Sequence, residues 1–213
     1  MKHRALWKAV SAALVPACFA FIGTAWAAPQ DDFSAGRKAY LAGDVVAAMT
    51  PLKRAADAGY APAQSLYAYI LDKAEYNEEA AQYFRRAAEQ GDADGQYGLG
   101  LLYATGDGIA RDPAAARDWL ERAASQNHGL AVVALSQAFL AGRLGFKTDP
   151  ADAAGLGWVR KAGALDSIPA LSYLAQGYRS GAFGAADLKE AERLEARIRE
   201  LSPDKNLRRG KKK

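Results

Sequence analysis

The sequence predicts an all-α protein, an α-solenoid in which about five antiparallel helix pairs stack along one axis. Half of the 213 residues are hydrophobic, alanine is abundant and β-branched residues are few, which favours helices over strands. The stretch 96–130 has the pattern of one complete helix pair, and partial copies of it recur along the chain. Such copies are expected, because a helix pair that cannot bury its own apolar face needs neighbours of the same kind.

The first half of this central stretch predicts a helix that ends in a glycine turn. Leu99 and Leu102 fall at helical spacing, and Gly98 and Gly100 lie beside them, where we expect another backbone to come close. The sequence Gly-Asp-Gly at 106–108 then breaks the helical pattern.

The second half predicts another helix. Asp112 has the position of an N-cap, and Pro113 suits the first helical residue because the missing N–H has no helical partner there. Small and bulky apolar residues then share one face: Ala116, Trp119, Leu120, Ala123 and Ala124.

The copies are clearest where each second helix ends. Each copy has two small residues, followed three positions later by a residue that suits a turn, at intervals of about 32, 36 and 39 residues. The four instances are Ala55-Ala56…Gly59, Ala87-Ala88…Gly91, Ala123-Ala124…Asn127 and Ala162-Gly163…Asp166.

This pattern resembles the Sel-one-like repeat (SLR) family, a relative of the tetratricopeptide (TPR) repeats. The similarity is strongest over 99–124 and extends over about 33–201, although the second unit has Asp-Lys-Ala at 72–74 in place of the glycine turn. The resemblance implies a right-handed solenoid, which we place at 28–201, with the first helix of each pair on the concave surface.

Residues 1–27 are predicted to be a signal peptide. A basic start precedes an apolar run over 9–25, and Ala-Trp-Ala at 25–27 predicts cleavage before Ala28. The alternative is an uncleaved membrane anchor. Cys18, the single cysteine, lies inside this segment, so the exported chain would contain no disulfide. We therefore expect a periplasmic or secreted protein.

The C-terminal end predicts an amphipathic helix over 188–201, which suits a cap on the solenoid or a helix that docks into another protein. The remaining residues, 202–213, are predicted to be a basic, disordered tail, either a solubilising end or a weak contact for an anionic surface. Nine positive charges lie at the two ends of the chain, so the net charge of +4 gives no evidence of a nucleic-acid-binding face.

The sequence predicts no catalytic residue, no metal site and no cofactor. The signal peptide apart, the chain has one histidine, His128, which suits a loop or cap position better than a catalytic base because no nucleophile accompanies it. Asp107 lacks the alternating acidic residues of a calcium loop.

The resemblance implies that ligands bind where the first helices face the concave surface. Carried over position by position, this face gives six partner-binding residues, of types that anchor protein contacts or bind a peptide backbone: Tyr69, Asp72, Tyr97, Gln137, Gln176 and Arg179.

We therefore predict an exported, non-enzymatic scaffold or adaptor that binds a protein or peptide partner in this groove, with an envelope assembly as the setting that the family suggests. One alternative is a cell-wall or β-lactam-type ligand binder or hydrolase, like the secreted cysteine-rich members of the family. The absence of cysteines after 18 counts against it. A membrane-tethered adaptor is the other alternative, and the partner and the oligomeric state stay open.

Overall fold

The computed structural model describes residues 28–202, which form ten α-helices and no β-strand. The predicted signal peptide, 1–27, and residues 203–213 of the predicted tail lie outside the described residues. The helices are α1 (Pro29–Leu41), α2 (Val45–Asp57), α3 (Ala61–Lys73), α4 (Asn77–Glu89), α5 (Ala93–Thr105), α6 (Pro113–Ser125), α7 (Gly129–Leu140), α8 (Ala153–Ala164), α9 (Ile168–Ser180) and α10 (Leu188–Leu201).

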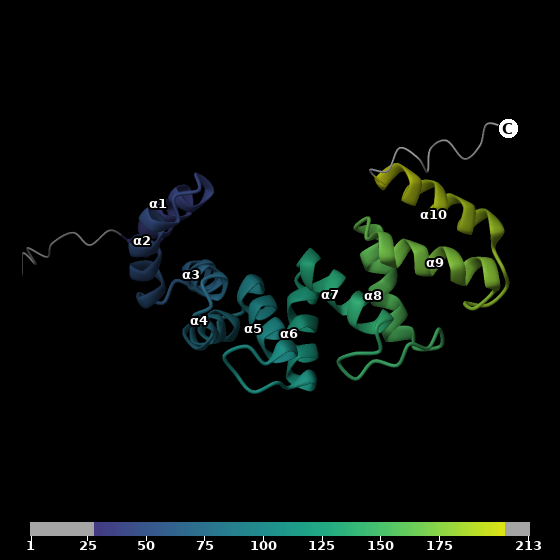
Figure 1. The fold of residues 1–213 in the computed structure, drawn as a ribbon, viewed down its shortest axis with the longest axis horizontal. Helices are drawn as coiled ribbons and strands as arrows, with labels where there is room; N and C mark the ends of the chain where they lie inside the picture. The colour runs from purple at the N-terminus through teal and green to yellow at the C-terminus, as the bar shows by residue number, and fades with distance from the viewer. Residues whose placement is uncertain (1–27, 203–213) are drawn as a thin grey trace, which may run out of the picture.

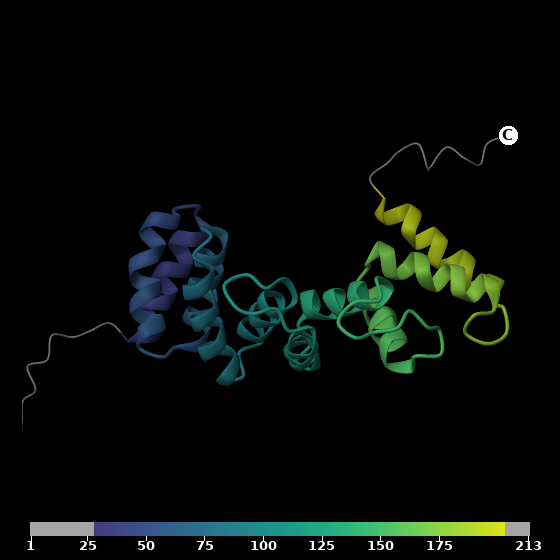
Figure 2. The same cartoon turned by 60° about the horizontal axis from the view of Figure 1, so that its bottom comes forward.

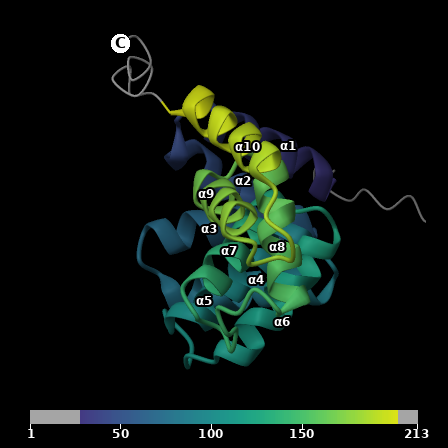
Figure 3. The same ribbon diagram turned by 90° about the vertical axis from the view of Figure 1, so that its right-hand side faces the viewer.

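The helices form a curved stack (Figure 1). The α1–α2 and α9–α10 pairs lie at its two ends, and α5 and α6 lie near the bottom of the arc. The two ends are well separated in Figure 2, and in the end-on view of Figure 3 α9 and α10 lie in front of the other helices. Each helix packs mainly against its neighbours in sequence. The structure therefore confirms an all-α solenoid of five helix pairs.

The predicted repeat register is confirmed by the backbone. The residues that end the four aligned units, Gly59, Gly91, Asn127 and Asp166, have φ values of 88°, 87°, 64° and 61°. Glycine, asparagine and aspartate are the residues that enter this left-handed region at least cost. The same sharp turn therefore leads from each unit to the next.

The α5–α6 pair forms as its sequence predicts. Gly106, with φ of 91°, ends α5, and the Asp112 side chain accepts hydrogen bonds of 3.0 Å from the backbone N–H groups of Ala114 and Ala115 at the start of α6. The role expected of Gly98 is wrong in one detail: a Cβ there would overlap the ring of Phe84, not a backbone.

The core is continuous along the stack but consists of two clusters that meet at α6. Trp119 packs against the cluster of α2–α5, whereas its neighbour Leu120 belongs to the cluster of α6–α10. At the C-terminal end, α10 buries Ala191 and Leu194 and exposes most of its charged residues, so the amphipathic helix predicted over 188–201 is confirmed.

We expect Gly98→Ala to lower the free energy of unfolding by about 1–3 kcal/mol, because the buried Phe84 ring must move to make room for the methyl group. Gly157→Ala in α8 is the matched control. It has open space around its Cβ position and should raise stability by about 0.5–1 kcal/mol. Urea unfolding of the two variants checks this, and equal effects would contradict the account.

Candidate partner-binding groove

The odd-numbered helices form the inner side of the stack. The pairs α1–α3, α3–α5 and α7–α9 approach each other, whereas no two even-numbered helices of the described chain do so to a comparable extent. In Figure 1, α3 and α5 lie toward the open side of the arc relative to α4 and α6. Helices that are closer on one side of a stack make that side concave.

A groove of about 640 Å³ lies on this inner side, across α1, α3, α5 and the start of α7. Its lining is largely apolar and aromatic, with a few charged residues, and includes Phe33, Arg37, Tyr40, Leu66, Tyr69, Asp72, Lys73, Asp94, Tyr97, Leu101, His128 and Leu130. Apolar clefts with a few placed polar groups are where ligands bind most often.

Three tyrosines come from consecutive odd-numbered helices. Tyr40 of α1 meets Tyr69 of α3 edge to face, with ring centroids 6.4 Å apart, and Tyr97 follows on α5. Burial raises the pKa of Tyr40 and of Tyr97, so both hydroxyls stay neutral and can donate a hydrogen bond. Tyr69 is 43% exposed, and such an aromatic ring in a groove is a typical anchor for a protein partner.

A lysine and an aspartate form a self-compensating pair in the middle of the groove. The Lys73 ammonium lies 3.1 Å from the Asp72 carboxylate and 5.4 Å from the centroid of the Tyr69 ring. The hydrogen bond to Asp72 raises the pKa of Lys73. These opposite charges leave the middle of the groove close to neutral.

At the other end, His128 joins two repeats. Its Nδ1 accepts a hydrogen bond of 3.2 Å from the backbone N–H of Ala131, so the histidine caps α7 as predicted. Because Nδ1 accepts, the ring proton lies on Nε2, which donates to Asp94 Oδ1 at 2.9 Å. The imidazole also stacks on Tyr97, with centroids 4.8 Å apart.

The structure brings together three of the six predicted partner-binding residues: Tyr69, Asp72 and Tyr97 line the groove. Gln137 and Gln176 are exposed on α7 and α9 but do not line it. Arg179 forms an ion pair of 2.6 Å with Glu195 of α10.

The prediction missed the contribution of α1 and the end formed by His128. Arg37 and Tyr40 were not assigned to the face because the first unit matches the repeat pattern poorly. The stretch Tyr40-Leu-Ala-Gly43 was the available signal, because an aromatic residue three positions before a glycine also occurs at Tyr103…Gly106, Phe139…Gly142 and Tyr178…Gly181.

Buried amides behind the groove fix how the pairs stack. Gln64 donates to the carbonyl of Ala56 at 3.0 Å and accepts from Gln90 at 2.7 Å. One repeat later, Gln96 contacts the carbonyl of Ala88 and accepts from Gln126 at 2.8 Å. Each of these two sets of hydrogen bonds links three successive helices. The buried amide groups are bonded because an unpaired amide would be costly in the core.

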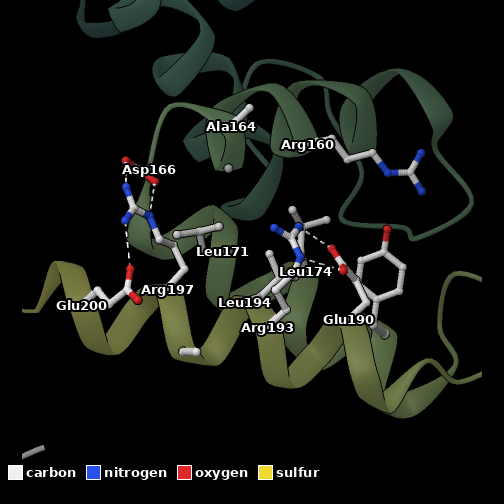
Figure 4. Close-up of a pocket in the computed structure, with 13 residues that line it drawn as sticks. Arg160, Ala164, Asp166, Leu171, Leu174, Glu190, Arg193, Leu194, Arg197 and Glu200 are labelled. Carbon is white, nitrogen blue, oxygen red and sulfur yellow. Dashed lines mark hydrogen bonds and ion pairs between the residues drawn. The ribbon is translucent and has the colours of Figure 1, made fainter. Parts of the chain in front are cut away.

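A second concavity, of about 610 Å³, lies between α8, α9 and α10 (Figure 4). Two of the three arginines that line it form ion pairs: Arg197 contacts Asp166 at 2.6 Å and Glu200 at 2.9 Å, and Arg193 contacts Glu190 at 2.6 Å. The Arg197–Asp166 contact ties α10 to the α8–α9 turn (Figure 4), so these residues serve as a joint that holds the last helix.

No three or more His, Cys, Asp or Glu side chains among residues 28–202 are grouped so as to hold a metal ion. Over the same residues, no helix has the length and apolar character needed to cross a membrane.

A stack of helix pairs with an aromatic groove on its inner side defines a protein of the helical-repeat class. The Sel1 repeat family model matches residues 61–92 and 93–128, which contain α3–α4 and α5–α6. The crystal structure of a Sel1 repeat protein from Oxalobacter formigenes is 31% identical, with a TM-score of 0.69, over 80% of this chain and 68% of that one.

A second crystal structure is that of c5321, a protective antigen present in uropathogenic Escherichia coli strains that displays an SLR fold. It is 26% identical with a TM-score of 0.71, over 81% of this chain but only 38% of that protein. No curated protein matches the sequence significantly. The chain belongs to the Sel1 repeat family, as the resemblance indicated, and Sel1 repeat proteins are generally non-catalytic scaffolds for protein interaction.

The ion pair between Arg197 and Asp166 predicts that the stability of α10 depends on pH. The hydrogen bond from Arg197 holds the pKa of Asp166 below its usual range. A carboxyl group of this kind stabilises the folded state above its unfolded pKa of about 4, and the effect is lost as the pH falls through the folded pKa. We expect the hydrogen-exchange protection of α10 to fall on acidification more in the wild type than in Asp166→Asn.

Glu192→Gln, which changes an exposed carboxylate on α10 that has no ion-pair partner within residues 28–202, is the control. In this variant the hydrogen-exchange protection of α10 should depend on pH as it does in the wild type. If Asp166→Asn also shows the wild-type dependence, the ion pair does not hold α10.

Proposed function

We propose that this protein is an exported, non-enzymatic scaffold that binds a segment of a protein or peptide partner in the groove formed by α1, α3, α5 and α7. The observation that carries the proposal is the exposed aromatic and apolar lining of this groove: Tyr69 is 43% and Leu130 62% exposed on a surface whose neighbouring residues are well packed. Aromatic side chains that a partner buries contribute most of the binding energy of many interfaces, so such an exposed lining favours a protein ligand.

The polar groups of the groove also suit a peptide. The neutral hydroxyls of Tyr40 and Tyr97 can donate to backbone carbonyl groups, and Asp94 can accept from a backbone N–H. The half-exposed apolar residues between them can receive side chains. A groove that offers both kinds of contact suits an extended segment, because it can bind the main chain as well as the side chains.

We further propose that the chain is exported through the segment 1–27 and works in an envelope assembly. The Ala-Trp-Ala sequence at 25–27 supports cleavage before Ala28, one residue before α1 begins. The mass of the protein isolated from its native cell tests this. A chain that starts at Ala28 is expected, and an intact, membrane-bound chain would support the tethered alternative instead.

The groove is tested with the variant Tyr69→Ala/Tyr97→Ala. Each truncated aromatic anchor should weaken binding by about 2 kcal/mol, roughly 30-fold. We therefore expect proteins that co-purify with the tagged wild-type chain from a solubilised native envelope to be lost with the variant, as measured by quantitative mass spectrometry.

Tyr76→Ala is the matched control, because Tyr76 is 63% exposed and lies outside the groove. It should recover the same proteins as the wild type. Circular dichroism checks that all three proteins have the same helix content. Equal recovery by the wild type and the double variant would show that the groove is not the binding surface.

A further inference from the structure

The two ends of the groove differ in charge. Arg37 lines the end formed by α1; its side chain is exposed, and it has no ion-pair partner among residues 28–202. Its guanidinium group is therefore available to a ligand. Arginine suits such a role, because its planar group can bind a carboxylate through two parallel hydrogen bonds.

Asp94, at the start of α5, lines the opposite end, and 78% of its side chain is exposed. Its Oδ1 contacts Nε2 of His128, whose Nδ1 accepts the capping hydrogen bond at the start of α7. The second carboxylate oxygen has no hydrogen-bond partner among residues 28–202. It is thus available to a cationic group of a ligand.

The surface between these ends contributes little net charge. Lys73 and Asp72 compensate each other at 3.1 Å, and the remaining lining consists mainly of the tyrosines, Leu66 and Leu101. The groove therefore has three zones in order: a cation, an apolar and aromatic middle, and an anion.

The separation of the two charges can be estimated from helix geometry. Arg37 lies late in α1 and Asp94 early in α5, two helix spacings away. Packed helices lie about 8–10 Å apart, and the perpendicular offset along the axis is roughly 10 Å, which together give about 19–22 Å. An extended chain of about six or seven residues covers this distance at 3.3–3.6 Å per residue.

We infer that the groove binds an extended peptide segment of six or seven residues with an apolar middle, an acidic group at one end and a basic group at the other. This inference rests on the proposed function and specifies its ligand. The acidic group pairs with Arg37 and the basic group with Asp94, while the apolar side chains contact the tyrosines. A segment with like charges at both ends binds more weakly, because one of its ends then lies beside a residue of the same charge.

The test uses four fluorescently labelled peptides with a common Leu-Gly-Tyr-Gly-Leu core and blocked termini. Their end residues are Glu and Lys, Gln and Gln, Glu and Glu, or Lys and Lys. Fluorescence anisotropy with the full mature chain should show the Glu–Lys peptide binding about threefold to tenfold tighter than the Gln–Gln peptide, with both like-charged peptides weaker. The preference should shrink at high salt.

Charge-swap variants then change the preference in a way that only the inferred arrangement produces. Arg37→Glu should select the Lys–Lys peptide, and Asp94→Lys should select the Glu–Glu peptide. The double variant should return to the Glu–Lys peptide, which docks in the opposite direction. Asp94→Asn retains a hydrogen-bond acceptor for His128 and should remove the discrimination at that end alone.

Arg143→Glu is the control for net charge, because Arg143 is exposed in the α7–α8 loop, away from the groove. It should leave the order of the four peptides unchanged. The inference is overturned if the charge-swap variants keep the wild-type order or if none of the peptides binds. The proposed function is judged separately, by whether Tyr69→Ala/Tyr97→Ala loses the co-purified proteins.

Discussion

The close approach of successive helices at small residues is the constraint on which the rest of this structure depends. Ala55, Ala87, Ala123 and Ala162 occupy one position of the repeat, and all four are fully buried. A larger side chain at this position would separate the helix from the next one, because a close-packed interior has no free volume to receive it. Small residues therefore set the spacing of the stack.

This spacing also produces the groove. Because α3 and α5 approach each other on the inner side, Tyr69 and Tyr97 project into one shared space. The buried amides of Gln64 and Gln96 repeat the same contact to the preceding unit and fix the rotation of each pair. The positions of the side chains that face a ligand thus depend on the buried contacts that the same helices make with the preceding unit.

The fold could be predicted because its signals are local: the left-handed turns, the caps and the small residues recur at fixed spacing. The groove was predicted only in part. Tyr69 and Tyr97 follow from the repeat register. The contact of His128 with Asp94 joins two different units, and the ion pair of Arg179 with Glu195 depends on how α10 docks on α9, so the pattern of a single helix reveals neither contact. The role of α1 was missed because its sequence departs from the repeat.

The central claim is that the partner docks on the groove of the N-terminal half and not along the whole inner face. Site-specific photo-crosslinking tests it most directly, with a benzoyl-phenylalanine in place of Tyr69, Tyr76 or Gln176 in the native cell. The account predicts a defined crosslinked protein from position 69 and none from 76 or 176. Crosslinks from 176 or 76, with none from 69, would contradict it.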